Sequence, residues 1–309
     1  MIEEPTLFII GAGASIPYSM PSTLALRGQI IQNGWSVFKR SRNHDIWGED
    51  PERIAVDTLI ERFSSSKCDS IDQFLYSSDN GEKFGVYAKK ILAGVLIGKQ
   101  LESESMIAAA GPIKGDWMQY LFNRMSEDCR NVNELVAKNQ VRFVTFNYDT
   151  LIERFQDYKF KAEYGIDDQE EFSPFPVHHV YGHLQELGRI RRHASPYNQM
   201  NAINKSAESI RTIAETERSR QDSSELGNWF VWAKRIFVLG FGWNKENIEQ
   251  LPWEECSNNL SVCSSALSLP KPVESRAASY LSRKGIKHLA QRFVDSDALG
   301  IVQNEVPLT

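Results

Sequence analysis

Two side chains that could take part in catalysis, Asn147 and Asp149, follow an apolar run of the sequence. Residues 141–146 have the length and composition of a buried strand, and the polar segment begins where that run ends. Side chains at the carboxyl end of a parallel strand point into the crevice where ligands bind, so both residues are candidates for a site. The segment alone favours a second interpretation, in which Asn147 or Asp149 caps a helix that begins near Thr150.

Histidine and tyrosine side chains alternate along residues 178–184. If a strand predicted over residues 176–181 continues to 183, then His179, Tyr181 and His183 share one face and line one side of a pocket. A histidine side chain has a pKa suited to proton transfer near neutral pH. Any single histidine is more often structural than catalytic, so the sequence leaves open which of the three serves in proton transfer.

Two glycine-containing segments follow apolar runs: Gly11-Ala12-Gly13-Ala14-Ser15 and Gly240-Phe241-Gly242-Trp243-Asn244. Small residues after a buried strand let the backbone approach a dinucleotide phosphate, whose charge the amides at a helix start can meet. The third glycine of the common dinucleotide fingerprint is missing after Gly13, and an ordinary strand turn explains the same glycines. Both interpretations stay open for each segment.

The elements that must position these residues are strands separated by helices. Apolar runs at 6–10, 141–146, 176–181 and 235–239 predict strands, and residues 51–138 have helical spacing throughout. This alternation predicts an α/β fold, a doubly wound, Rossmann-like parallel sheet with a large helical insertion at about 51–138. From about residue 260 to 309 we expect a C-terminal extension with an amphipathic helix near 277–289 and a short last strand within 293–302.

Composition excludes several classes of protein. The 309 residues carry a net charge of −5 with dispersed lysines and arginines, which is not the footprint of a nucleic-acid-binding protein. The apolar stretch 91–98 is too short to cross a bilayer and the N-terminus lacks the features of a signal peptide, so we expect a cytoplasmic protein without membrane contact. The four cysteines show no metal-ligand spacing, so we expect neither zinc nor another metal.

Taken in order, the motifs resemble those of the sirtuin family over most of the chain. They are Gly-Ala-Gly-Ala-Ser with Pro21 after it, Thr-x-Asn-x-Asp from Thr145, a glycine beside a histidine after a strand, and Gly-x-Gly from Gly240. The chain is most similar to the sirtuin-like domains of bacterial antiphage defence systems, which also carry Ser-Ile-Asp-x-Phe-Leu, here residues 70–75. The resemblance implies one sirtuin-like domain over residues 1–309.

The resemblance also implies roles for individual residues. Asn147 would hold the water or ribose at the reacting carbon, and Asp149 would fix the nicotinamide amide. Tyr181 stands where sirtuins have a catalytic histidine, so we choose His183 as proton acceptor because it lies close by. The implied NAD-binding residues are Gly11, Ala12, Gly13, Ser15, Pro21, Thr145, Phe146, Tyr181, Gly240, Gly242 and Asn244.

Sirtuin deacylases carry a zinc ribbon with two cysteine pairs, and this chain has none. The resemblance therefore implies an NAD glycohydrolase that releases nicotinamide and ADP-ribose, with NAD as its substrate, and that depletes NAD in abortive infection. Two alternatives remain: an NAD-dependent deacylase or ADP-ribosyltransferase, and a non-catalytic module that binds NAD or ADP-ribose. Such an activity requires regulation, which we expect from homo-oligomerisation or from a separately encoded partner, a HerA-type ATPase rather than a short Argonaute.

Overall fold

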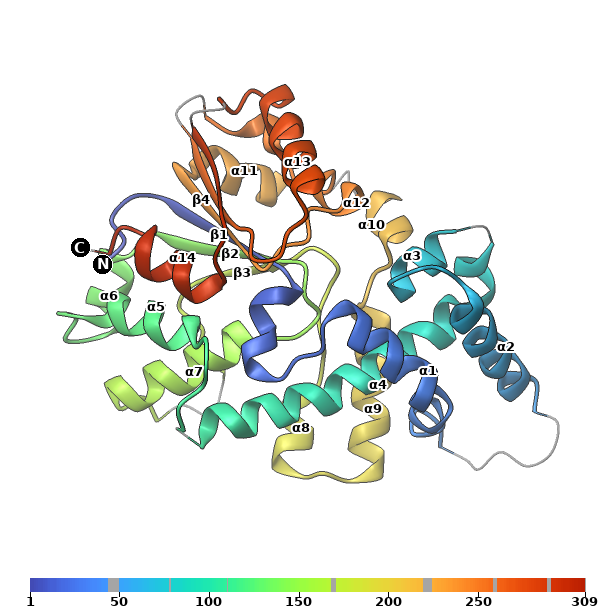
Figure 1. Ribbon diagram of the computed structural model, residues 1–309. Helices are drawn as coiled ribbons and strands as arrows, with labels where there is room; N and C mark the ends of the chain where they lie inside the picture. Colours follow the sequence, from blue (N-terminus) through green and yellow to red (C-terminus); the bar gives the residue numbers. More distant parts are fainter. Residues whose placement is uncertain are drawn as a thin grey trace.

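The computed structural model describes residues 1–43, 50–77, 79–109, 111–167, 171–218, 224–257, 260–287 and 290–308. These residues form a six-stranded, all-parallel sheet with the order β3-β2-β1-β4-β5-β6 (Figure 1). The strands are β1 (Thr6–Ile10), β2 (Val141–Thr145), β3 (Val177–His179), β4 (Arg235–Leu239), β5 (Ser261–Ser265) and β6 (Gln291–Val294). The predicted α/β fold is confirmed, and this strand order is the one that doubly wound dinucleotide-binding folds use.

The central strand β1 is buried on both faces, as its continuous apolar sequence requires. Phe8 and Ile10 belong to one hydrophobic cluster, whereas Leu7 and Ile9 belong to another on the opposite face. Phe8 stacks against Phe143 of β2 and Phe237 of β4, with ring centroids 5.4 and 5.6 Å apart. Aromatic side chains on one face therefore pack β1 against both β2 and β4, in addition to the backbone hydrogen bonds between these strands.

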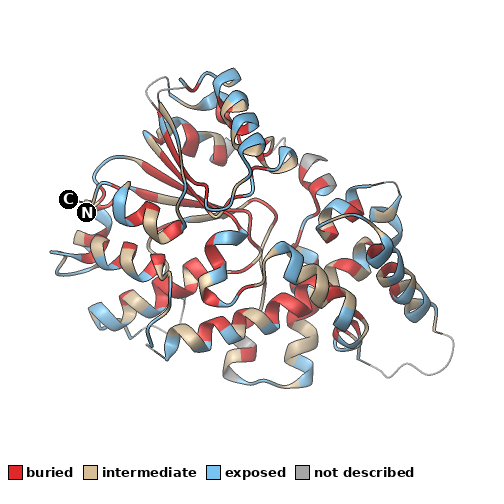
Figure 2. Ribbon diagram, viewed as in Figure 1, coloured by how far each residue is buried: buried red, intermediate tan, exposed pale blue. Residues whose placement is uncertain are grey.

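Helices cover both faces of the sheet, which makes the fold doubly wound (Figures 1 and 2). One face is covered by α5 (Trp117–Ser126), α6 (Val132–Lys138), α7 (Leu151–Tyr164) and α14 (Ala298–Asn304), together with part of α4 (Asn80–Ala108). The other face carries α11 (Ser224–Trp232), α12 (Lys245–Ile248), the short η3 (Trp253–Glu255) and α13 (Lys271–Arg283).

The predicted insertion is helical, and its long helix α4 organises a second group of helices beside the sheet (Figure 1). Against α4 pack α1 (Thr23–Lys39), α2 (Pro51–Ser65), α3 (Ile71–Tyr76) and, from a distant part of the chain, α9 (Pro196–Ser209). The remaining helices are the short η1 (Ala12–Tyr18), α8 (Leu187–Arg192) and α10 (Ile213–Arg218), which contacts α3.

The C-terminal part of the chain completes the sheet, because β5 and β6 extend it beyond β4. The helix predicted near 277–289 is displaced: α13 spans Lys271–Arg283, and residues 288–289 lie outside the described residues. The last strand is β6, which overlaps the predicted range 293–302 only at residues 293 and 294, and half of that range belongs instead to α14. Asp297 caps the N-terminus of α14 by accepting a hydrogen bond from the Gly300 amide. Among the described residues, no helix combines the length and apolar character needed to cross a membrane.

Candidate functional site

A cavity of about 510 Å³ lies at the carboxyl edge of the sheet, within the size range of small-molecule sites. Its walls come from the loops after β1, β2 and β4 and from the starts of α1 and α3. The strand order changes direction between β1 and β4, which is where ligands bind in open α/β sheets. The predicted residues that line it are Gly11, Ala12, Gly13, Ser15, Pro21, Phe146, Asn147, Asp149, Tyr181, Gly240, Gly242 and Asn244.

The glycines after β1 and β4 bring two loops into backbone contact. Gly240 has a φ of +61°, and a Cβ atom there would lie 2.0 Å from the amide nitrogen of Ala14. A Cβ on Gly11 would lie 2.6 Å from the Gly240 carbonyl oxygen, which accepts a hydrogen bond from the Gly13 amide at 2.9 Å. Close approach of the loops thus accounts for these glycines, and the Gly13 amide is already engaged within the protein.

A better-placed group for an anion is the N-terminus of α1, where Pro21, Ser22 and Thr23 line the cavity. Ser22 caps this 17-residue helix by accepting a hydrogen bond from the Ala25 amide at 3.3 Å. The first turn holds no acidic residue, so the positive end of the helix dipole is not neutralised there. This helix start supplies partial positive charge and hydroxyl groups to the cavity.

The loop after β2 holds Asn147 in a defined orientation. The Asn147 side-chain amide donates hydrogen bonds to Ser15 Oγ at 2.9 Å and to the Gly11 carbonyl at 3.3 Å. Its backbone amide donates to Thr145 Oγ1 at 3.0 Å. Among the described residues no donor reaches Asn147 Oδ1, so this oxygen is available to a ligand. Thr145 does not line the cavity and contributes only through its hydrogen bond with the Asn147 backbone amide.

Asp149 is a buried carboxyl group beside Asn147. Its Oδ2 accepts a hydrogen bond from Ser15 Oγ at 3.4 Å and its Oδ1 accepts one from the Leu151 amide at 3.3 Å, just where α7 begins. Burial raises the pKa of Asp149 to about 6, against the lowering effect of these hydrogen bonds and of His179. A carboxyl group with this pKa exchanges protons near neutral pH. The helix-capping and ligand-site interpretations of this segment are therefore compatible.

The expectation that His179, Tyr181 and His183 line one side of the pocket is wrong for both histidines. Strand β3 ends at His179, and Gly182 has a φ of +72°, so the two-residue alternation stops before residue 183. Only Tyr181 reaches the cavity. The ring of His183 instead interacts with the Leu184 carbonyl through Nδ1 at 3.1 Å, and burial together with the charge of His179 lowers its pKa.

His179 does not line the cavity but contacts the backbone of the loop that carries Asn147. Its Nδ1 lies 3.0 Å from the Asn147 carbonyl oxygen and its Nε2 lies 2.7 Å from Glu153 Oε1. A carbonyl and a carboxylate both accept hydrogen bonds, so this position favours the imidazolium form, in which both ring nitrogens donate. Burial lowers the pKa of His179, but Glu153 and the Asn147 carbonyl outweigh that effect and raise it overall.

Tyr181 occupies the place where the family resemblance puts a histidine. It is 5% exposed and its hydroxyl donates a hydrogen bond to Asn247 Oδ1 at 2.7 Å. Its ring packs against Phe146 and Tyr148 with centroid distances of 5.7 and 6.3 Å. Tyr181 and Phe146 therefore form an aromatic wall of the cavity.

The lining also includes residues that the sequence analysis did not predict as site residues, among them Asp72, Tyr148 and Asn247. The Tyr148 hydroxyl donates to Asp72 Oδ1 at 3.0 Å, which joins the insertion to the loop after β2. The Ser-Ile-Asp-x-Phe-Leu segment was a signal for Asp72, but nothing in the sequence shows that it lies beside residue 148. Asn247 has no such motif around it.

The charged side chains of the cavity lining are predominantly acidic: Asp69, Asp72, Asp149 and Glu246, with Arg27 as the lining residue of opposite charge. The guanidinium of Arg27 is engaged, because it donates to the backbone carbonyls of Phe63, Ser64, Ser66 and Cys68. The described lining residues thus favour a ligand whose cationic part faces the carboxylates and whose anionic part faces the start of α1.

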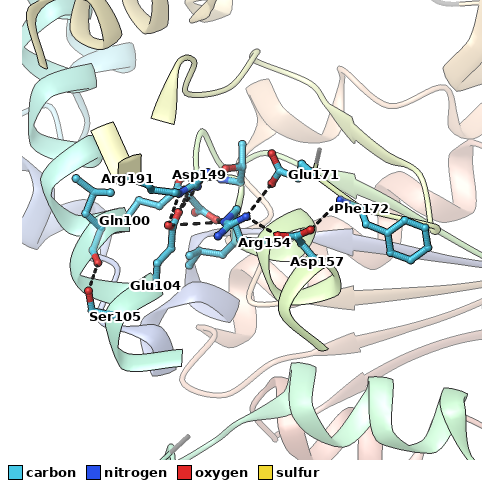
Figure 3. Close-up of polar contacts among 12 residues, drawn as sticks. Gln100, Glu104, Ser105, Asp149, Arg154, Asp157, Glu171, Phe172 and Arg191 are labelled. Atoms are coloured by element: carbon cyan, nitrogen blue, oxygen red, sulfur yellow. Dashed lines mark hydrogen bonds and ion pairs between the residues drawn. The ribbon is translucent and has the colours of Figure 1, made fainter. Parts of the chain in front are cut away.

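A buried ionic network braces the helix that follows Asp149 (Figure 3). Glu104 of α4 lies between Arg191, at 2.5 Å, and Arg154 of α7, at 3.7 Å. Arg154 also pairs with Asp157 at 2.6 Å, and Asp157 accepts a hydrogen bond from the Phe172 amide. Through the Arg154–Glu104 pair the network joins α7 to α4, and through Asp157 it joins α7 to the segment at Phe172.

No protein-family model matches this sequence, and a search of curated proteins gives no match. Within the described part of the chain, no group of three or more histidine, cysteine or acidic residues is arranged to hold a metal ion.

Proposed function

We propose that this protein binds NAD in the cavity and hydrolyses the bond between nicotinamide and ribose. The observation that carries the proposal is the position of Asn147 and Asp149 beside both glycine loops, in one cavity where the strand order reverses. The sequence resemblance to sirtuin-like NAD hydrolases supports the same reaction.

The charges of the cavity suggest how NAD is oriented. The pyrophosphate carries the negative charge and would lie at the start of α1, where Ser22 and Thr23 present hydroxyl groups. The nicotinamide ring of NAD is cationic and would lie toward Asp149, because the buried carboxylate of Asp149 attracts positive charge. In this orientation the bond to be cleaved lies near Asn147.

Cleavage requires control of a water molecule and of one proton. As the carbon–nitrogen bond breaks, its electron pair leaves with nicotinamide, which becomes neutral, and positive charge develops on the ribose. Asn147 Oδ1 accepts a hydrogen bond from the attacking water and orients it. The water oxygen bonds to the ribose carbon, and its proton passes to Asp149, which releases it to solvent. The products are nicotinamide, ADP-ribose and one proton.

Mass spectrometry of NAD incubated with the full chain tests the proposal. The wild-type protein is expected to release nicotinamide and ADP-ribose in equal amounts, and Asn147→Ala is expected to lower the rate by about 100-fold or more. Asn33→Ala, an exposed change on α1 away from the cavity, is the matched control and should retain the rate. Unchanged nicotinamide release by Asn147→Ala would falsify the proposal.

A second candidate is a module that binds NAD or ADP-ribose without chemistry. Two observations favour it: none of the described residues that line the cavity is a histidine, and the Tyr181 hydroxyl is held by Asn247. Calorimetric binding of NAD and of ADP-ribose with no detectable nicotinamide release would support this function over hydrolysis. Release of nicotinamide that depends on Asn147 would rule it out.

A further inference from the structure

Asp72 lies in the helical insertion, where hydrogen bonds tie the start of α3 to the residues before it. It lies in the first turn of α3, where the Ser70 hydroxyl accepts a hydrogen bond from the Gln73 amide at 3.1 Å. The Gln73 side chain in turn accepts one from the Asp69 amide at 3.1 Å. The neighbouring Ile71 and Phe74 are buried in the core, so Asp72 has a fixed backbone position at the cavity.

The two oxygens of the Asp72 carboxylate have different surroundings. Oδ1 accepts the hydrogen bond from the Tyr148 hydroxyl at 3.0 Å. No other described residue donates to Oδ2, although the backbone amide of Asp72 itself also interacts with the carboxylate. Oδ2 is not among the buried side-chain atoms that lack a hydrogen-bond partner. Because Asp72 lines the cavity, Oδ2 is open to a ligand there.

Tyr148 joins Asp72 to the loop that carries Asn147 and Asp149, and all four residues line the same cavity. A ligand that fills this cavity can therefore contact both Asn147 and the Tyr148–Asp72 pair. In NAD, the part beside the cleaved bond is the nicotinamide-side ribose, which carries two hydroxyl donors.

We propose that Asp72 binds substrate directly, with its Oδ2 accepting hydrogen bonds from the hydroxyl groups of the nicotinamide-side ribose. Tyr148 holds the carboxylate in place through Oδ1. This inference rests on the proposed NAD site and adds a contact that the insertion, rather than the sheet, contributes to it.

A carboxylate suits this role better than a neutral acceptor. Burial raises the pKa of Asp72 to about 6, against the hydrogen bond from Tyr148 that lowers it, so the group is ionised at neutral pH. A hydrogen bond to a charged acceptor is stronger than one between neutral groups. The negative charge also lies where positive charge develops as nicotinamide leaves.

The test compares Asp72→Asn, Tyr148→Phe and the control Asp57→Asn in the full chain. Asp57 is an exposed residue of α2 with the same charge and no place in the cavity. Calorimetry measures the binding of NAD and of an NAD analogue that lacks both hydroxyls of the nicotinamide-side ribose. Asp72→Asn should weaken NAD binding about 10- to 100-fold, Tyr148→Phe by a smaller factor, and Asp57→Asn not at all.

The analogue separates a direct contact from a structural role. The wild-type protein should bind it about as weakly as Asp72→Asn binds NAD, and Asp72→Asn should lose little further affinity for it. The proposal is overturned if Asp72→Asn loses as much affinity for the analogue as it loses for NAD. It is also overturned if Asp72→Asn binds NAD as tightly as the wild-type protein does. NAD that binds without release of nicotinamide refutes the hydrolysis and still measures the Asp72 contact, whereas absence of NAD binding overturns both.

Discussion

At the scale of single residues, the protonation of Asp149 is expected to control the reaction. Its pKa of about 6 lies above the usual 3.8 of an aspartate because the group is buried. The ionised form accepts the proton from water, so kcat/KM for NAD should fall as the pH decreases below about 6. Protonation of Asp72, whose pKa is also about 6, adds to this fall by weakening NAD binding. Asp149→Asn should lower the plateau value by about 100- to 10,000-fold, as measured by initial rates of nicotinamide release from pH 5 to 8.

The titration of Asp149 does not unfold the protein at low pH, so unfolding through this residue does not explain the fall in kcat/KM. A carboxyl whose pKa is raised on folding binds its proton more tightly in the folded state, so its contribution to stability increases as the pH falls through 6 toward 4. Thermal melting at each pH provides the check. A full plateau rate in Asp149→Asn, with Asp57→Asn as its exposed control, would show that another group accepts the proton.

Residue-level prediction succeeded where local sequence determines position. Asn147 and Asp149 directly follow β2, so the end of the strand places both at the cavity. The bond between Tyr148 and Asp72 joins positions 76 apart, and no local pattern encodes that distance. His183 was predicted wrongly as a pocket residue because strand β3 ends at His179 and the left-handed backbone of Gly182 turns the chain away.

At the scale of elements, the contact between the loops after β1 and β4 is the feature most sensitive to substitution. Gly240→Ala would force a Cβ atom to within 2.0 Å of the Ala14 amide nitrogen while keeping a positive φ. The loops must then separate, which should cost roughly 2 to 4 kcal/mol of unfolding free energy. Urea denaturation measures the loss, and NAD binding should weaken with it because both loops line the cavity.

Gly85→Ala is the matched control for this substitution. Gly85 lies within α4, where an added Cβ meets no atom within 4 Å. Alanine is the better helix former, so this variant should gain roughly 0.5 to 1 kcal/mol. A Gly240→Ala protein as stable as wild type would mean that the two loops do not make the close contact.

The elements themselves were predictable in proportion to the strength of their patterns. The apolar runs of β1, β2 and β4 predicted buried strands because strands covered on both faces need apolar residues at most positions. Strand β5 was missed, since Ser-Val-Cys-Ser-Ser shows no apolar run although four of its five residues are buried. Its neighbours and not its own sequence place it in the sheet.

At the scale of the whole molecule, α4 connects the helical insertion to the candidate site. Gln100 is fully buried in this helix and forms two hydrogen bonds with Thr150, the residue after Asp149. Its Oε1 accepts from the Thr150 amide at 2.9 Å, and its Nε2 donates to Thr150 Oγ1 at 2.6 Å and to Glu104 Oε1 at 2.8 Å. The insertion therefore holds the loop that carries both proposed catalytic residues, a coupling that the sequence pattern of α4 could not reveal.

Gln100→Leu tests this coupling. Leucine has a similar volume but cannot pair with Thr150, so the partly buried amide N–H and hydroxyl of Thr150 lose their partner. We expect this to cost about 1 to 3 kcal/mol in unfolding free energy. NAD turnover should fall more than NAD binding, because Asn147 and Asp149 act on the reacting atoms and the loop that carries them loosens. Gln119→Leu, on the exposed side of α5, should leave both properties unchanged. Assays well below the melting temperature separate the two effects: if Gln100→Leu is destabilised yet turns over NAD at the wild-type rate, then α4 supports the fold alone and the sheet positions the loop without help from the insertion.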